Sequence, residues 1–246
     1  MVQYKIYPTL LDKYEGYINS SRIYQQFWGF AEEPSITEEE FEQQQFQSLI
    51  DGINRVPFES DAADRGTAFN EVVDCIIDKR TSDKMEIKAY KESGVIAVNY
   101  KHHLFNFPFD LTVKIAKALS GGITSKFCEG ILPTRYGDVK LYGFIDQLMP
   151  FTIVDLKTTS KYSAFKYRDN WQHRVYPYCL NQEGININEF EYIITDFKSI
   201  WSEEYTFNEI EQQKLLNHVE RFIEFIEQHR HLITDKKIFA LDEVAA

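Results

Sequence analysis

Two acids and one amine lie close together in the middle of this 246-residue chain. Asp146 is near the end of the largely apolar run 139–149, and Asp155 and Lys157 belong to a second run, 152–157. Carboxylate oxygens are the ligands that hard divalent cations prefer, and an ammonium group beside them can stabilise a further negative charge. These residue types therefore suit a site that binds a metal cation together with an anionic group.

The two runs predict an antiparallel hairpin. Pro150 cannot donate a ladder hydrogen bond, so it ends the first strand at the bend. If the bend is centred just after Pro150, Gln147 faces Val154 and Asp146 faces Asp155. The hairpin is the element that must bring the two acids together.

Directly opposed side chains of an antiparallel pair have Cβ atoms about 4.5–5.5 Å apart, and like charges there are destabilising. A bound cation would remove this penalty at Asp146 and Asp155. Strand side chains alternate between faces, so Lys157 is predicted on the same face as Asp155. A bend longer by one residue would shift the register and separate the acids.

Further residues extend this set into a series along the chain. The series has the form G-x-x-D, D-x-K and Q-x-x-x-Y, at Gly143, Asp146, Asp155, Lys157, Gln172 and Tyr176. It resembles the PD-(D/E)XK nuclease superfamily, and specifically its RecB-like exonuclease branch. The resemblance implies an α/β fold with a restriction-endonuclease-like core, in which helices flank a central mixed β-sheet.

The resemblance also implies roles for the hairpin residues. Asp146 and Asp155, with the main-chain carbonyl of Leu156, would hold Mg²⁺ or Mn²⁺. Lys157 would orient or deprotonate the attacking water and help to stabilise charge on the phosphate. Asp155 would supply the anionic neighbourhood that this lysine needs.

Gln172 and Tyr176 are expected beside these residues. A helix is predicted over residues 162–180, with Pro177 kinking it or ending it, and residues four apart share a helical face. The resemblance implies that both side chains contact nucleic acid or support Lys157; the alternative is a core tyrosine and a surface glutamine. Four cations give this segment a local positive charge where a phosphate backbone could lie: Lys161, Lys166, Arg168 and Arg174.

A second motif precedes the hairpin. Residues 64–74 open a predicted helix and resemble the G-T-x-x-H-E motif of the branch, with Asn70 in place of the metal-binding histidine. An amide oxygen suits Mg²⁺ but is a weaker ligand for Mn²⁺ than imidazole. Glu71 is next to Asn70, and Asp74 lies one helical turn beyond it, so either could substitute as a ligand. The alternative for both acids is an ordinary polar helix surface.

Length and composition predict one domain over residues 1–246, since 43% of the residues are hydrophobic and this suffices for one sizeable core. A helical N-terminal region is expected over about residues 1–60. It includes a helix over residues 38–54 that begins with a capping-box pattern at Thr37 and Glu40. Residues 84–107 predict a hairpin insertion.

The remaining sequence features concern cofactors and compartment. Cys75, Cys128 and Cys179 are far apart and in no metal-binding spacing, so neither disulfides nor an iron–sulfur cluster is expected. The sequence has no signal-peptide pattern and no long apolar run, which predicts a soluble protein without membrane contact, in the cytoplasm of a bacterial or phage-infected cell. A net charge of −11 means that any nucleic-acid contact must be local.

Taken together, these features predict a metal-dependent deoxyribonuclease, and an exonuclease acting on DNA ends in recombination, repair or phage DNA processing. Further partners would be a recombination protein or a second copy of the chain. Asn70 motivates an alternative, a catalytically impaired nuclease fold that serves as a nucleic-acid-binding or protein-interaction subunit. In a second alternative, a non-nuclease metal-binding or interaction protein, the hairpin acids are incidental.

Overall fold

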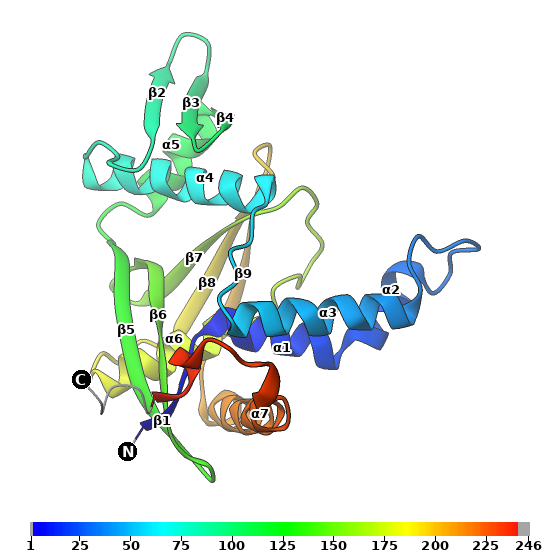
Figure 1. Ribbon diagram of the computed structural model, residues 1–246. Helices are drawn as coiled ribbons and strands as arrows, with labels where there is room; N and C mark the ends of the chain where they lie inside the picture. Colours follow the sequence, from blue (N-terminus) through cyan, green and yellow to red (C-terminus); the bar gives the residue numbers. More distant parts are fainter. Residues whose placement is uncertain (1, 241–246) are drawn as a thin grey trace.

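The computed structural model describes residues 2–240, which form an α/β fold around a central mixed β-sheet (Figure 1). The sheet order is β1-β6-β7-β8-β9, and β5 pairs with β6 off this path. The β1/β6 and β7/β8 pairs are parallel, whereas β5/β6, β6/β7 and β8/β9 are antiparallel. Its strands are β1 Val2–Ile6, β5 Ile123–Thr134, β6 Gly137–Leu148, β7 Thr152–Thr158, β8 Glu189–Thr195 and β9 Ile200–Thr206. The predicted central mixed sheet flanked by helices is confirmed.

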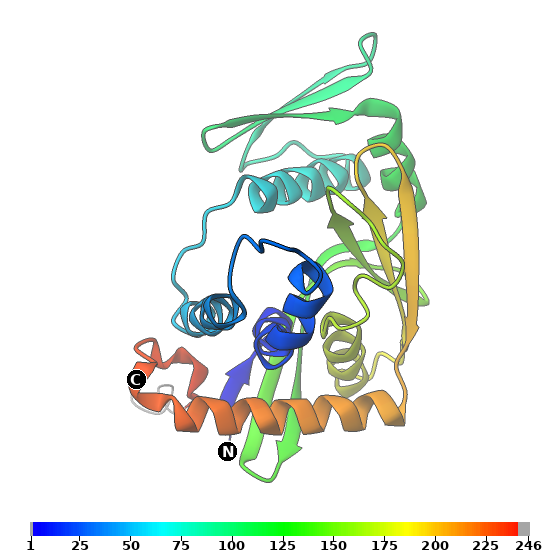
Figure 2. The ribbon, with the colours of Figure 1, turned by 90° about the vertical axis from the view of Figure 1, so that its right-hand side faces the viewer.

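Seven α-helices occur in the described residues, and they cover both faces of the sheet (Figure 2). They are α1 Pro8–Ile18, α2 Ser20–Trp28, α3 Glu38–Ile53, α4 Asp61–Asp78, α5 Phe109–Ala118, α6 Gln172–Gln182 and α7 Glu209–Gln228. Two short 3₁₀ turns, Arg230–Leu232 and Lys236–Ile238, follow α7. None of the helices within residues 2–240 is long and apolar enough to cross a membrane.

Two hydrophobic clusters lie on opposite faces of the sheet. On one face, Ile153 and Tyr192 pack in a cluster with residues of α1, α3, α6 and α7. On the other, Val154, Leu156 and Ile193 pack in a cluster with residues of α4, α5 and the smaller sheet. Successive residues of β7 thus alternate between two cores, as expected for a strand covered on both faces.

The described residues begin with a strand rather than with a helix. β1 joins the central sheet parallel to β6, and Tyr4 and Ile6 are buried. The predicted helical region of residues 1–60 is therefore wrong for its first few residues, although α1, α2 and α3 follow. The helix over 38–54 is confirmed, and the capping box between Thr37 and Glu40 is present.

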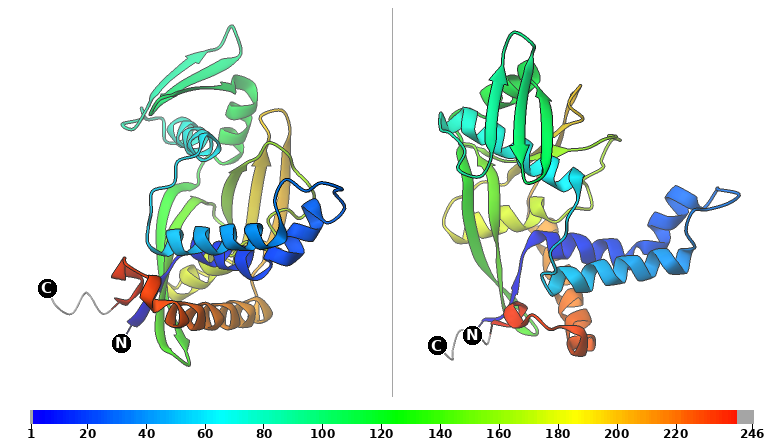
Figure 3. Two further views of the ribbon diagram at one scale, coloured as in Figure 1. Left: turned by 45° about the vertical axis from the view of Figure 1, so that its right-hand side comes forward. Right: turned by 45° about the horizontal axis from the view of Figure 1, so that its top comes forward.

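Residues 84–107 contribute a second sheet, not a simple hairpin. β2 Glu86–Tyr90, β3 Val95–Tyr100 and β4 His103–Pro108 form an antiparallel three-stranded sheet with the order β2-β3-β4. It lies beyond α4, away from the central sheet (Figure 3). Its buried Ile96, Val98 and Phe107 belong to the cluster shared with α4 and α5.

The helix predicted over residues 162–180 is shorter at its start and longer at its end. α6 begins only at Gln172, and the preceding residues form turns. α6 also continues through Pro177 to Gln182. Pro177 lies in the second turn, where it removes the bond that its N–H would give to the His173 carbonyl and crowds that carbonyl. The buried residues that follow it hold the helix on the sheet, since Tyr178, Cys179 and Leu180 are all at most 4% exposed.

One edge of β6 is divided between two strands. β5 follows the other edge over most of its length, whereas β1 reaches only to Leu141 and β7 pairs only with Gln147 and Leu148. Among the described residues, positions 142–146 therefore have no strand partner on the divided edge. This interruption in the sheet places Asp146 at a gap between β6 and β7.

Candidate active site at the gap between β6 and β7

The register of the β6–β7 hairpin agrees with the sequence prediction at its first pairs. Gln147 pairs with Val154, and Leu148 pairs with Ile153. The ladder ends there, so Asp146 and Asp155 do not form the expected ladder pair. Instead, the Asp146 carboxylate extends into the gap, and its Oδ2 accepts a hydrogen bond of 3.1 Å from the Leu156 N–H. The side chain takes the place that a main-chain partner would have in a continuous ladder.

Asp155, Lys157 and Gln172 form a closed polar triangle. Lys157 Nζ lies 2.8 Å from Asp155 Oδ2 and donates to Gln172 Oε1 at 2.6 Å, while Gln172 Nε2 donates to Asp155 Oδ1 at 2.6 Å. The predicted placement of Asp155 and Lys157 on one face is confirmed. The Lys157 contact has an ion-pair distance without hydrogen-bond alignment, so Asp155 Oδ2 keeps acceptor capacity.

The charges of this group shift two pKa values. Burial raises the pKa of Asp146, and the neighbouring Asp155 charge raises it further. Burial acts to lower the pKa of Lys157, but the contacts with Asp155 and the charges of Asp146 and Asp12 together outweigh it, and the net pKa is raised. Lys157 therefore stays protonated at neutral pH. Asp146 is a carboxylate whose charged form is costly until a cation approaches it.

The position of the Tyr176 ring requires a glycine at position 143, the first residue of the G-x-x-D motif. A Cβ added at Gly143 would meet Tyr176 Cε1 at 2.7 Å, so only glycine lets the α6 side chain lie against β6. Tyr176 is 5% exposed. Burial, followed by the Asp155 charge, raises the pKa of its phenol, which stays neutral. Tyr176 is thus placed to support the triangle from behind, and Gln172 is the residue of the Q-x-x-x-Y motif that touches Lys157.

Asp12 of α1 is a nearby acid that sequence reasoning missed. Its Oδ1 accepts a 2.6 Å hydrogen bond from the Trp171 N–H, immediately before α6 begins. Burial raises the pKa of Asp12 to about 7, with the Lys157 charge acting in the opposite direction. An Asp12 carboxyl oxygen accepts from the Trp171 N–H whether or not the group is protonated. Asp12 therefore anchors the start of α6 and with it Gln172.

A cavity of about 230 Å³ opens beside Asp146, between α4 and the gap. Asn70, Asp74, Asp146, Gln147 and Leu156 all contribute to its wall. Asn70 Nδ2 donates to Asp146 Oδ2 at 3.3 Å, so the side chain at position 70 faces the first acid. The cavity wall includes Asp146 but not Asp155, which is 1% exposed and faces α6.

Glu71, the other metal ligand expected on α4, has a different partner. Its Oε1 lies 2.7 Å from Arg80 Nη1, and its Oε2 accepts from Arg80 Nη2 at 3.3 Å. The hydrogen bond to Arg80 lowers the pKa of Glu71 to about 2. Although Glu71 lines the same cavity, its charge is neutralised by this pair. The geometry favours a structural ion pair over the metal-ligand role.

Glu71→Gln should therefore separate stability from metal binding. We expect it to lower the free energy of unfolding at pH 7 by about 1–3 kcal/mol, because Arg80 loses the closer of its two carboxylate partners and keeps only Asp78 at 3.4 Å. Glu71 contributes stability above its ordinary pKa of 4.5 that is lost as the pH falls toward 2, and this loss should be smaller in the variant. The rise in Tm produced by Mn²⁺ should be unchanged.

The control for that experiment is the exposed pair between Glu86 and Lys88, which are 2.6 Å apart. Glu86→Gln should change stability little, since exposed ion pairs contribute little. Thermal unfolding of both variants, with EDTA and with excess Mn²⁺, makes the comparison. If Mn²⁺ no longer raises the Tm of the Glu71→Gln variant, Glu71 is a metal ligand after all.

Asp74 and Gln147 form a second polar contact that no sequence motif marks. Gln147 Nε2 donates to Asp74 Oδ1 at 2.8 Å, and burial raises the pKa of Asp74 to about 6. Gln147 is 1% exposed, yet its Oε1 has no hydrogen-bond partner among the described residues. The only sequence signal is a glutamine within the apolar run 144–149. This unpartnered oxygen adds a neutral acceptor to the cavity wall.

The donors at the gap fit a hard divalent cation. Within residues 2–240, no three His, Cys, Asp or Glu side chains are arranged as a metal site. Mg²⁺, however, needs only one or two protein carboxylates, because water and substrate phosphates complete its shell. Asp146 and Asp155 would supply these, with the Leu156 carbonyl and the Asn70 amide as neutral oxygens. Burial and the Asp155 charge raise the pKa of Asp146, and a bound cation would relieve both effects.

Part of the positive charge expected before and within α6 is engaged by the protein itself. Arg174 Nε bonds to Glu211 at 2.6 Å, and its side chain is only 11% exposed. Lys166 Nζ bonds to Thr159 Oγ1 and to the Lys161 carbonyl. Arg168 lies 3.5 Å from Asp169. This segment therefore offers less free positive charge than the sequence predicts.

Comparison with known proteins adds little to this geometry. No protein-family model matches the chain. No curated protein matches it either. Among solved structures, the chain is similar to one described as the crystal structure of SSO0001, with a TM-score of 0.37 and 13% sequence identity. The match covers 47% of this chain and 57% of that one, so the similar region is little more than half of that protein.

Proposed function

We propose that the chain is a metal-dependent nuclease of the PD-(D/E)XK superfamily, in its RecB-like branch, that hydrolyses phosphodiester bonds of DNA. One observation carries the proposal. Asp146 lies at the gap between β6 and β7 beside Asp155, and Lys157 is held by Asp155 and by Gln172. Each of these contacts joins residues of the motifs that resemble this branch. We further propose an exonuclease that acts on DNA ends in recombination, repair or phage DNA processing.

The side chains divide the chemistry between them. Mg²⁺ or Mn²⁺, when bound by Asp146, Asp155 and the Leu156 carbonyl, supplies Lewis acidity toward a phosphate oxygen. Lys157 is protonated and aligned by Gln172, so it serves to orient water and to stabilise negative charge on the phosphate. This geometry favours orientation of the water over its deprotonation by Lys157. Asp12 and Tyr176 hold α6, and therefore Gln172, in place.

The setting that we propose is the cytoplasm of a bacterial or phage-infected cell. All three cysteines are buried free thiols, as is usual in a reducing compartment. A recombination protein or a second copy of the chain remains our proposal for a protein partner.

Asn70 supports a second candidate, a catalytically impaired nuclease fold that binds nucleic acid or another protein. The observation that favours it is the contact between Asn70 and Asp146, which puts an amide where the related motif has an imidazole. The amide donates to Asp146, which a metal would otherwise approach from this side. In this candidate, cleavage is slower than in enzymes with histidine or requires a higher metal concentration.

Asn70→His should strengthen Mn²⁺ binding by about tenfold, because imidazole is the better ligand for this ion. Isothermal titration with Mn²⁺, and in parallel with Mg²⁺, measures the effect. The Mg²⁺ affinity should change less, since Mg²⁺ prefers oxygen ligands. Unchanged Mn²⁺ affinity would mean that the side chain at position 70 does not face the metal.

Incubation with four DNA forms tests the proposed activity. The purified chain is mixed with linear and circular substrates, each single-stranded and double-stranded, in Mg²⁺, in Mn²⁺ and in EDTA. Degradation of linear DNA alone would support the exonuclease, whereas nicking of circles would mean an endonuclease. Binding without cleavage in any metal would favour the impaired subunit. If the chain neither binds nor cleaves any of these DNA forms, the acids of the hairpin have no role in nucleic-acid chemistry.

A further inference from the structure

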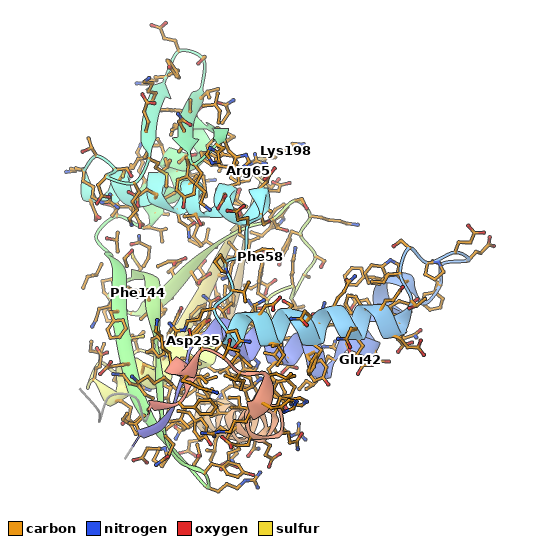
Figure 4. All side chains as sticks on the ribbon, in the orientation of Figure 1. Glu42, Phe58, Arg65, Phe144, Lys198 and Asp235 are labelled. Carbon is orange, nitrogen blue, oxygen red and sulfur yellow. The ribbon has the colours of Figure 1, made fainter. Side chains whose placement is uncertain are left out.

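The face of the β5–β6 ribbon that turns away from α6 carries an unusual set of side chains. Gly130 and Gly143 lie against α6, so the alternate positions Lys140, Tyr142 and Phe144 project from the opposite side. Phe127 of β5 is paired directly with Phe144. We call the side chains of Phe127, Lys140, Tyr142 and Phe144 the outer face. Figure 4 shows Phe144 on this ribbon, below α4.

The outer face leads to the candidate active site. Asp146 is two residues beyond Phe144 on β6, so the two side chains leave the strand on the same side. A strand rises about 3.3 Å per residue, which places Lys140 roughly 20 Å from Asp146 along β6. An extended chain lying on the outer face would therefore run directly to the carboxylate at the gap.

A basic cavity of about 450 Å³ lies at the far end of the outer face. Its wall includes four cations, Lys5, Arg55, Lys140 and Lys237, and no acidic residue among those described. Carboxylates of the described residues stand near two of these cations, since Glu129 is 2.6 Å from Lys140 and Asp235 is 3.5 Å from Arg55. Both pairs are partly exposed, so they contribute little and can exchange for a stronger anion. In a chain with a net charge of −11, this is a local positive site.

Two exposed aromatic rings adjoin the cavity. Phe127 is 39% exposed and Phe144 is 61% exposed, and their ring centroids are 5.2 Å apart at an angle of 58°. Phe127 also lines the cavity, together with Tyr142, whose hydroxyl accepts from Arg55 at 3.3 Å. Exposed phenyl rings beside cations match single-stranded nucleic acid, whose unpaired bases stack on aromatic side chains while its phosphates contact Lys and Arg. Paired bases in a duplex do not offer their faces in this way.

We propose that the outer face and its basic cavity bind a single-stranded nucleic acid segment, with bases stacked on Phe127 and Phe144 and phosphates at Lys140 and Lys237. The inference rests on the proposed function for its link to the active site, and it names the form of the substrate there. Binding itself needs no metal. It is thus measurable apart from cleavage.

Fluorescence anisotropy with a labelled 20-nucleotide oligo(dT) in EDTA tests the proposal, using the full chain. Phe127→Ala combined with Phe144→Ala should weaken binding at least tenfold, since each stacked base contributes substantially. Lys140→Gln combined with Lys237→Gln should weaken binding and reduce the slope of log K against log salt by about 1.4, or about 0.7 per lost phosphate contact. A duplex of the same length should bind the wild type and the aromatic double variant alike, because its paired bases do not offer their faces to Phe127 and Phe144.

Matched controls come from exposed residues elsewhere. Phe30, near the tip that follows α2, is fully exposed, and Lys117 is exposed on α5. Phe30→Ala and Lys117→Gln should each bind the oligonucleotide as the wild type does. Equal losses in the controls, or unchanged binding in both double variants, would overturn the proposal. So would a wild type that does not bind the oligonucleotide in EDTA.

The outcomes for this surface and for the enzyme are distinguishable. If the wild type cleaves DNA with metal and the double variants bind the oligonucleotide as tightly as the wild type, the nuclease proposal stands and the binding-surface proposal is wrong. If the wild type cleaves nothing but the double variants lose oligonucleotide binding, the binding-surface proposal stands and the nuclease proposal is wrong. If both proposals hold, the aromatic double variant should also cleave linear single strands more slowly at subsaturating substrate.

Discussion

Lys157→Ala is expected to reduce metal-dependent cleavage by about 10²–10⁴-fold while leaving metal binding nearly intact. The ammonium group of Lys157 contacts Asp155 Oδ2 and Gln172 Oε1, and its side chain is 23% exposed. It is therefore available to water and phosphate, whereas the cation would be held by oxygen atoms. Cleavage rates in excess Mn²⁺, and the Tm with and without Mn²⁺, give the two measurements.

The variant should also be less stable in EDTA, because Asp155 is 1% exposed and loses its ion-pair partner. The control is Lys198→Ala, at an exposed lysine in the bend between β8 and β9. This control should change neither cleavage nor Tm. Near-normal turnover in Lys157→Ala would mean that Lys157 has no role in catalysis. Loss of the Mn²⁺ shift would mean that Lys157 organises the metal ligands rather than the water.

The hairpin register was predictable because it depends on a local feature. Pro150 ends β6 at the bend, and the pairing of Gln147 with Val154 follows from its position. The separation of the strands beyond this pair was not predictable. The same edge of β6 is shared with β1, which pairs with it as far as Leu141. No local feature of the hairpin marks this sharing.

Helical phase decided between the two candidate ligands on α4. Asn70 and Glu71 are adjacent, and adjacent residues on a helix point about 100° apart. The sequence therefore allowed only one of them to face Asp146 directly, without showing which. The structure turns Asn70 to Asp146 and Glu71 to Arg80. Arg80 follows the end of α4, so this pairing depends on how the chain leaves the helix.

The supporting residues carried no local signal. Asp12 acts on α6 from a helix about 160 residues earlier in the chain, through the Trp171 N–H. Trp171 and Gln172 were expected inside a helix that in fact begins at Gln172. A helix that began at residue 162 would have left no free N–H at Trp171 for Asp12. The wrong start predicted for α6 therefore hid the hydrogen bond between Asp12 and Trp171.

Asp146→Asn is expected to abolish most of the metal-induced rise in Tm while leaving the metal-free protein as stable as the wild type or slightly more stable. In the metal-free protein, burial and the Asp155 charge make the ionised form of Asp146 costly. Asparagine removes that charge and keeps an oxygen that can accept from the Leu156 N–H, the bond that measures 3.1 Å in the wild type. It also removes one of the two anionic metal ligands.

The expected size follows from linkage. A ligand present at 100 times its Kd stabilises the folded state by about 2.7 kcal/mol, which for a chain of this size raises Tm by roughly 5–10 °C. The wild type should show this rise in excess Mn²⁺, and Asp146→Asn should show little of it. Asp83→Asn, at an exposed acid, is the control and should keep the full rise. Asp146→Ala should be less stable than Asp146→Asn in EDTA, because it leaves the Leu156 N–H without its acceptor. A metal-free Asp146→Asn protein that is much less stable than the wild type, or one that keeps the full Mn²⁺ shift, would give Asp146 a structural role and place the metal elsewhere.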